Sequence, residues 1–193
     1  KKINPDSIVV VTGCYAQTSP DEVKGMDEVD IVIGNSLKTG IVDAAYSMYQ
    51  GSKVNNKDRF SRILSYDELT SYEDMGVVTS DESSMCRAYI KIEEGCNRFC
   101  SYCLIPYARG KVRSRDPGEI VEEAQRLVRN GYKEIVLTGI NTALYGTESG
   151  FDFKREQGEE ELAGIEVIIR RINALDGDFR IRLSSLEPTV VDV

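Results

Sequence analysis

Strand-like and helical patterns alternate through the second half of the sequence, and this alternation restricts the fold more than any other feature. Apolar residues recur with helical spacing over 117–128 and 162–175. Strand-like runs lie around them at 88–92, 134–139 and 179–183. A strand, a helix and a second strand in this order form a right-handed crossover between parallel strands. We therefore predict an α/β fold in which three strand–helix units make an open sheet, short of a closed barrel.

The first of these helices has clear signals at both ends. Asp116 is expected to cap it, with Pro117 at its first position and Glu119 at its third. Gly131 follows the last apolar residue, at the position where a left-handed residue commonly ends a helix. These signals predict a helix that begins at Pro117 and ends just before Gly131.

The first fifty residues carry a shorter version of the same α/β pattern. Apolar runs at 8–11 and 31–33 suit strands buried on both faces, and residues 41–49 show helical spacing. The segment Ser19–Glu22 has the sequence of a capping box, with the serine as the cap. Two strands bury their faces poorly by themselves, so we expect this α/β domain to be incomplete on its N-terminal side.

Residues 52–86 differ in composition from both flanking regions. Lys, Asp, Glu, Ser and Asn dominate, and the apolar runs are brief, at 63–64 and 77–78. We interpret this region as a linker with room for a short strand. Its acidity is typical of a solvated surface.

The overall composition excludes several classes of protein. No run of about 18 apolar residues is present, so we expect no membrane-spanning helix and no membrane partner. The formal net charge is −8, whereas a domain that binds nucleic acid by bulk charge alone is usually basic. The chain has no histidine, which excludes histidine bases and zinc–histidine sites.

Five cysteines remain as reactive side chains, and their distribution is informative. They are Cys14, Cys86, Cys96, Cys100 and Cys103. An odd number, with three cysteines inside eight residues, argues against a disulfide framework. It favours thiols kept reduced in the cytoplasm.

The three clustered cysteines have the spacing Cys-x3-Cys-x2-Cys, between a predicted strand and a predicted helix. A tight loop can turn all three sulfurs inward. Three thiolates leave one corner of a cubane iron–sulfur cluster without a protein ligand. An open corner suits direct binding of a small molecule, as the open position of catalytic zinc does.

A structural zinc site is the alternative interpretation of this loop. With no histidine available, Cys86 or Cys14 would have to be the fourth ligand. Zinc ribbons usually pair one Cys-x2-Cys with a second, and no second copy is present. Inert buried thiols are disfavoured because the loop is polar.

Four stretches of the sequence resemble one known family. The cysteine loop, over residues 94–110, is similar to the cluster motif of radical S-adenosylmethionine methylthiotransferases. The runs 113–117 and 131–141 extend the likeness, and residues 11–17 resemble the end of that family's N-terminal domain. The branch that the chain most resembles modifies threonylcarbamoyladenosine next to the tRNA anticodon.

The resemblance implies a domain arrangement. Residues 1–51 would be the C-terminal part of a Rossmann-like α/β domain, followed by the linker 52–86. Residues 87–193 would be the first three βα units of a partial radical S-adenosylmethionine barrel. The rest of the family's pattern is expected outside the sequence, so we expect an internal fragment with no turnover of its own.

The resemblance also implies cofactors and their ligands. Cys96, Cys100 and Cys103 would hold a [4Fe-4S] cluster whose open iron binds S-adenosylmethionine. Cys14 would be one ligand of a second cluster, and a second S-adenosylmethionine would supply the methyl group. As the alternative, Cys14 is a small apolar residue at a strand end. Cys86 fits no ligand position and is interpreted as an incidental thiol.

Candidate S-adenosylmethionine contacts follow the later strands, because ligands of parallel α/β folds gather at the carboxyl ends of strands. Thr138 and Gly139 could meet the methionine amine through their backbone groups. Glu187 could accept from a ribose hydroxyl, and Tyr102 could contact the adenine. The remaining candidates are Asn141, Ser184 and Ser185. For all of these residues, turn formation or plain packing is the competing interpretation.

Five cations surround the cysteine loop without an acid among them. They are Arg98, Arg109, Lys111, Arg113 and Arg115. We interpret them as attracting tRNA phosphate and the anionic cluster. The alternative is that they pair with acids elsewhere in the chain.

The leading hypothesis is therefore a tRNA methylthiotransferase that receives electrons from a donor such as a flavodoxin or ferredoxin. Two other substrates fit the same loop, namely isopentenyladenosine in tRNA and an aspartate of a ribosomal protein. A zinc-stabilised binding module without catalysis is the hypothesis from a different class.

Overall fold

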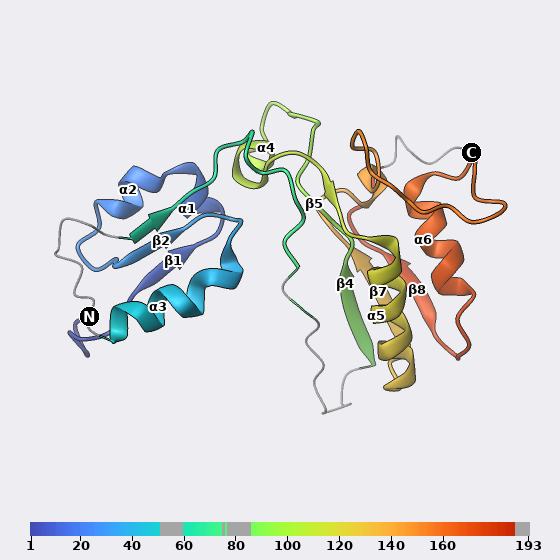
Figure 1. Ribbon diagram of the computed structural model, residues 1–193, viewed down its shortest axis with the longest axis horizontal. Helices are drawn as coiled ribbons and strands as arrows, with labels where there is room; N and C mark the ends of the chain where they lie inside the picture. The colour runs from blue at the N-terminus through green and yellow to red at the C-terminus, as the bar shows by residue number, and fades with distance from the viewer. Residues whose placement is uncertain (51–59, 75, 77–85, 188–193) are drawn as a thin grey trace. The chain divides into compact units, whose positions relative to one another are not determined.

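The computed structural model describes residues 1–50, 60–74, 76 and 86–187 (Figure 1). The chain forms two compact units. The first unit comprises Lys1–Met75 and Arg98–Lys111, and the second comprises Gly76–Asn97 and Val112–Val193. Each unit has its own parallel sheet and its own hydrophobic core.

The sheet of the second unit has the order β4-β7-β8. Its strands are β4 (Arg87–Lys91), β7 (Glu134–Thr138) and β8 (Arg180–Leu183), and both pairings are parallel. The connections contain α5 (Pro117–Arg129) and α6 (Gly164–Asn173), which lie side by side (Figure 1). The predicted α/β alternation with a parallel sheet is confirmed.

One face of this sheet forms the core with the two helices. Alternate strand residues point to it, among them Ile90, Ile135 and Leu137, all fully buried. On α5 and α6 the apolar residues three and four apart meet them, including Ile120 and Ile168. The carboxyl ends of the three strands therefore lie along one edge, called here the carboxyl edge, and the opposite side is the amino edge.

The predicted ends of α5 are confirmed. Asp116 Oδ1 accepts hydrogen bonds from the backbone N–H groups of Gly118 (2.8 Å) and Glu119 (3.2 Å). Such a cap stabilises a helix by about 1 kcal/mol. Gly131 has φ 89°, the left-handed conformation expected after the helix.

A two-stranded antiparallel ribbon lies next to the cysteine loop. Its strands are β5 (Glu93–Glu94) and β6 (Arg113–Ser114), in which Glu93 is opposite Ser114. The short helix η2 (Thr142–Leu144) follows β7.

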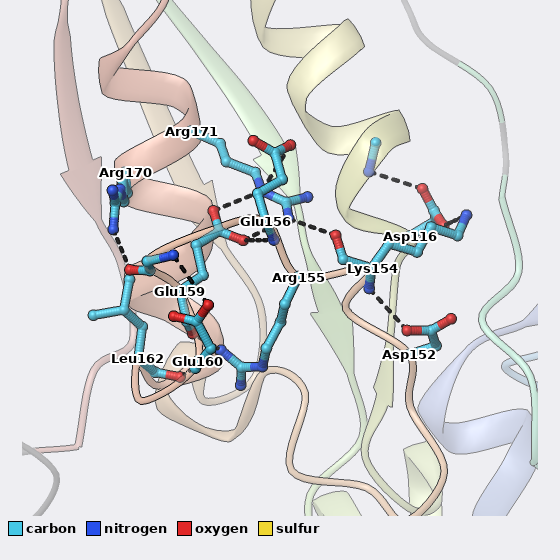
Figure 2. A network of polar contacts seen from close by, with 12 residues as sticks. Asp116, Asp152, Lys154, Arg155, Glu156, Glu159, Glu160, Leu162, Arg170 and Arg171 are labelled. Carbon is cyan, nitrogen blue, oxygen red and sulfur yellow. Dashed lines mark hydrogen bonds and ion pairs between the residues drawn. The ribbon is translucent and has the colours of Figure 1, made fainter.

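Salt bridges anchor the long connection between η2 and α6, as Figure 2 shows. Arg171 of α6 donates to both carboxylate oxygens of Glu159, at 2.9 and 2.7 Å, and to the backbone oxygen of Lys154. The Lys154 ammonium in turn pairs with Asp116 at 2.8 Å. The connection is thus tied both to α6 and to the start of α5.

The sheet of the first unit is also parallel, with the order β1-β2-β3. Its strands are β1 (Val10–Thr12), β2 (Ile31–Ile33) and β3 (Phe60–Arg62). The first strand begins two residues later than the apolar run predicted, and β3 is the short strand for which the linker had room. Short helices complete the unit: α1 (Cys14–Thr18), α2 (Pro20–Lys24), η1 (Lys38–Gly40), α3 (Ile41–Tyr49) and α4 (Ile105–Arg109).

The capping box predicted at Ser19 is wrong. The Ser19 side chain makes no capping hydrogen bond to α2. Ser19 also ends α1, where its own N–H donates to the Tyr15 carbonyl at 2.9 Å. Ser19 follows the last residue of α1 and also precedes the first residue of α2, and its backbone N–H ends α1.

Much of the predicted linker lies outside the described residues, including the apolar run at 77–78. The domain boundaries predicted near residues 51 and 86 adjoin these stretches and remain predictions. Within the part of the chain that the structure describes, no helix has the length and apolar character needed to cross a membrane.

Candidate metal and cofactor site

The cysteine loop is a tight connection between β5 and α4. Gly95 has φ 84° and Phe99 has φ 48°, a left-handed conformation that is uncommon outside glycine. The Cys103 N–H donates to the Cys100 carbonyl at 2.8 Å, which closes a turn between the last two cysteines. The loop thus changes direction between Cys96 and Cys100 and again before α4.

All three loop thiols are free, and they differ in exposure. Cys96 is buried, Cys103 is half-buried and Cys100 is exposed. Cys96 belongs to the second unit, and Cys100 and Cys103 belong to the first. Among the described residues, no three Cys, Asp or Glu side chains are already grouped as a metal-ligand set. The donor chemistry of three free thiols in one loop fits an iron–sulfur cluster.

Cys14 lies at the first position of α1, directly after β1, and its thiol has polar neighbours. Asn35, which follows β2, donates from Nδ2 to the Cys14 sulfur at 3.5 Å and to the Ala108 carbonyl at 2.5 Å. Burial raises the pKa of the Cys14 thiol, but hydrogen bonds from Asn35 and Arg109 and the Arg109 charge outweigh burial and lower it below its ordinary value. This environment favours the thiolate, the form that binds metal.

The sequence pattern did not single out Asn35, although one signal was present. Asn35 follows a buried strand in the same way that Cys14 does, and parallel strands end at the same edge of a sheet.

The structure brings together the predicted residues that follow β7 and β8. The Asn141 amide donates to Glu187 Oε2 at 3.0 Å. Thr142 donates from its backbone N–H to the Ser185 carbonyl and from its hydroxyl to the Ser184 carbonyl, both at 3.1 Å. The two loops therefore form one surface at the carboxyl edge.

Gly139 lies at this edge for a steric reason that the sequence did not reveal. A Cβ atom at this position would collide with the carboxyl group of Glu93. Glu93 is completely buried, and its Oε1 accepts a hydrogen bond from the Asn141 N–H at 2.8 Å. A charged residue at a strand end normally suggests a solvated surface, so the sequence pattern missed Glu93.

The five cations around the loop do not form one surface. Arg113 and Arg115 are 4% and 6% exposed. Arg115 pairs with Glu123 and, at 3.4 Å, with Glu119. The interpretation of Arg113 and Arg115 as tRNA contacts is therefore wrong, because both side chains are buried and the charge of Arg115 is paired within the fold.

The other three cations lie in the first unit. Arg98 is exposed and Arg109 is half-buried near Cys14. Lys111 pairs with Asp67 at 3.1 Å and lies over the Tyr66 ring. Arg98 is thus the cation of the five that is most accessible to a large partner.

Tyr102, the candidate adenine contact, is 90% exposed. Packing in the first unit's core therefore does not hold its ring. Its neighbour Phe99 is different, because it packs against Tyr66 and Tyr107 with centroids 6.0 and 5.7 Å away.

Comparison with known proteins identifies the superfamily of the chain. The family model of the radical SAM superfamily matches residues 90–192, more than half of the chain. The chain therefore belongs to the radical SAM superfamily.

Within this superfamily, the chain is similar to several methylthiotransferases. The chain is 40% identical over 192 residues to the threonylcarbamoyladenosine tRNA methylthiotransferase MtaB of Bacillus subtilis, covering 97% of this chain and 38% of the relative. It is 35% identical to the tRNA-2-methylthio-N(6)-dimethylallyladenosine synthase of Clostridium novyi, covering 97% and 38%. It is also 35% identical to the ribosomal protein uS12 methylthiotransferase RimO of Clostridium perfringens, covering 83% and 35%. The chain spans about two fifths of the length of these relatives.

Proposed function

We propose that this chain is part of a radical S-adenosylmethionine methylthiotransferase in which Cys96, Cys100 and Cys103 hold a [4Fe-4S] cluster. The observation that carries the proposal is the loop of three free thiols that follows β5, the short strand after the first strand of a parallel sheet, in a chain of this superfamily. When bound, such a cluster supplies the electron that cleaves S-adenosylmethionine reductively.

The residues at the carboxyl edge would bind and orient S-adenosylmethionine. Thr138 ends β7 and Gly139 follows it, and both would offer backbone groups to the methionine amine. Glu187, already oriented by the Asn141 amide, would accept from a ribose hydroxyl, with Ser185 alongside. The exposed Tyr102 ring is available to the adenine. Preorganised groups of this kind hold a cofactor and exclude water.

The two sheets fit the fold of this class. A parallel sheet in sequential order, with both helices on one face, is the arrangement of the first part of a partial (β/α) barrel. The three parallel strands of the first unit fit the C-terminal part of a Rossmann-like domain. Both assignments belong to the proposal.

Cys14 would be one ligand of a second cluster. Its thiol has a lowered pKa and lies at the end of a parallel strand, next to the Asn35 amide. A second cluster needs further ligands besides Cys14.

The proposed substrate is threonylcarbamoyladenosine in tRNA, modified at carbon 2 of the adenine in the cytoplasm, with electrons from a flavodoxin or ferredoxin. The 40% identity to a relative named for this substrate favours it. Dimethylallyladenosine in tRNA and a ribosomal protein are the substrates of other relatives at 35% identity, and they are the alternatives.

The experiment that tests the proposed activity is nucleoside analysis of tRNA from cells that lack the gene. We expect threonylcarbamoyladenosine to accumulate without its methylthio group, and the intact gene to restore the modification. Loss of the methylthio group from dimethylallyladenosine, or from a ribosomal protein alone, would assign the corresponding alternative. Unchanged methylthiolation of all three would contradict the proposal.

A further inference from the structure

A buried carboxyl group lies at the carboxyl edge, next to the turn that follows β7. Glu93 is completely buried, and its Oε1 accepts from the Asn141 N–H. Its Oε2 is also buried and has no hydrogen-bond partner among the described residues. Gly139 packs so closely against this carboxyl that a Cβ atom there would displace the Glu93 side chain. One side chain thus contacts both ends of the turn from Gly139 to Asn141.

The charged groups around Glu93 do not neutralise it. Glu94 lies on the same strand and pairs with Lys91 at 3.0 Å. Ser114, opposite Glu93 in the ribbon, donates its N–H and hydroxyl to Glu148. Burial raises the pKa of Glu93 to about 7, with further increases from the charges of Glu94 and Glu148, while the N–H groups of Asn141 and Ile140 lower it. The neutral acid is therefore the form present below this pH.

We infer that Glu93 is a positioning residue for the S-adenosylmethionine site: its carboxyl group fixes the turn from Gly139 to Asn141, and through Asn141 it orients Glu187. This inference rests on the proposed function for the identity of the ligand. The contact between Glu93 and the turn involves only residues of this chain and does not depend on the ligand.

The positioning acts through a short chain of hydrogen bonds. Glu93 holds the Asn141 backbone, and the Asn141 amide then donates to Glu187 at 3.0 Å. Asn141 Oδ1 accepts from the Ala143 N–H at 3.3 Å, which starts η2. The hydrogen bond from the Asn141 N–H to the Glu93 carboxyl is the first in this chain. Loss of the carboxyl therefore leaves the buried Asn141 N–H without an acceptor and allows the turn to move.

Three substitutions separate geometry from charge. Glu93→Gln keeps the acceptor oxygen and the shape of the neutral acid. Glu93→Asp keeps the carboxyl group but shortens its reach by one methylene, and Glu93→Ala removes the acceptor. We expect Glu93→Gln to behave as the original protein does, and the Asp and Ala variants to lose the positioning.

The first readout is hydrogen exchange of the Asn141 amide in protein without cofactors. It is expected to exchange slowly in the original protein and in Glu93→Gln, and about tenfold faster in the other two variants. The Ser184 amide, which donates to the Leu137 carbonyl, is the internal control and stays protected. Slow exchange of Asn141 in Glu93→Ala, or fast exchange in Glu93→Gln, would overturn the inference.

The second readout is S-adenosylmethionine binding to anaerobically reconstituted protein, with iron content as the control for cluster assembly. The Asp and Ala variants should bind about tenfold more weakly at unchanged iron content. Equal binding by all variants would overturn the role of Glu93 while the proposed function stands. If the proposed function fails instead, the original protein itself gives no binding, and the Asn141 exchange pattern is unaffected.

Discussion

Two buried glutamates lie at opposite edges of the same parallel sheet, and their surroundings shift their pKa values in opposite directions. Glu134 begins β7 at the amino edge, where Arg87, Arg180 and Arg182 surround its carboxylate. Burial raises the pKa of Glu134, but the hydrogen bonds and charges of Arg180 and Arg87 outweigh it and lower the pKa below its ordinary value. Glu93 lies at the carboxyl edge, where burial raises its pKa to about 7.

We propose that the amino edge serves stability and that the carboxyl edge binds S-adenosylmethionine. At the amino edge the acid is surrounded by cations, of which Arg87 also interacts with Tyr89. At the carboxyl edge the acid accepts from the Asn141 N–H, and its second oxygen has no hydrogen-bond partner within the part of the chain that the structure describes. Active sites of barrel proteins lie at the carboxyl ends of the strands, and the opposite ends serve stability. The proposed S-adenosylmethionine site follows this division within a three-stranded sheet.

The largest expected effect distinguishes Cys100 of the cysteine loop from Cys86 at the amino edge. Cys100→Ala removes a proposed cluster ligand. We therefore expect that anaerobic reconstitution of this variant with iron and sulfide yields no cluster absorption at about 400 nm. Cys86→Ala is the matched control, because Cys86 lies beside Arg87 and Glu134 at the amino edge. It should leave the absorption unchanged. Cluster loss in Cys86→Ala, or full absorption in Cys100→Ala, would contradict the proposed cluster ligands.

The next effect is the pH dependence of stability that Glu93 causes. Its pKa is 4.5 when exposed and about 7 in the fold, so between these values the folded state binds more protons than the unfolded state. The free energy of unfolding therefore falls as pH rises through this window, by at most about 3 kcal/mol.

Glu93→Gln removes this contribution. Urea denaturation at pH 5 and pH 8 should show a smaller loss of stability in the variant than in the original protein. An identical loss in both proteins would mean that Glu93 is not held neutral by the fold.

The smallest effect is expected at Glu134, and it has the opposite sign with pH. Its lowered pKa contributes stability above the ordinary value of 4.5, and this contribution is lost as pH falls through the folded value. Glu134→Gln should lower the urea midpoint at pH 7 and make less difference in acid. The effect is modest because the partner guanidinium groups stay solvated. Weaker binding of S-adenosylmethionine in this variant would contradict the division between the edges.

The sequence predicted those features that depend on local patterns. The helical spacing around Ile120 and the apolar run of β7 predicted the parallel sheet, because burial on a helix-covered face demands both. Asp116 and Gly131 predicted the ends of α5, since capping involves only neighbouring residues.

Features that depend on distant partners could not be predicted in this way. Glu93 contacts a turn that lies 46 to 48 positions later in the sequence, so its burial left no local signal. Arg115 is buried because Glu123 of α5 pairs with it, although its charge suggested a surface residue. Ser19 failed as a cap because the preceding helix ends at the same residue.

The proposed function requires that the cysteine loop holds an iron–sulfur cluster with one iron open to S-adenosylmethionine. The most direct measurement is the electron paramagnetic resonance spectrum of the reduced, reconstituted protein before and after S-adenosylmethionine is added. The account predicts a cluster signal that changes on addition in the original protein and is absent in Cys100→Ala. Bound zinc with no such signal, or a cluster signal that S-adenosylmethionine leaves unchanged, would contradict it.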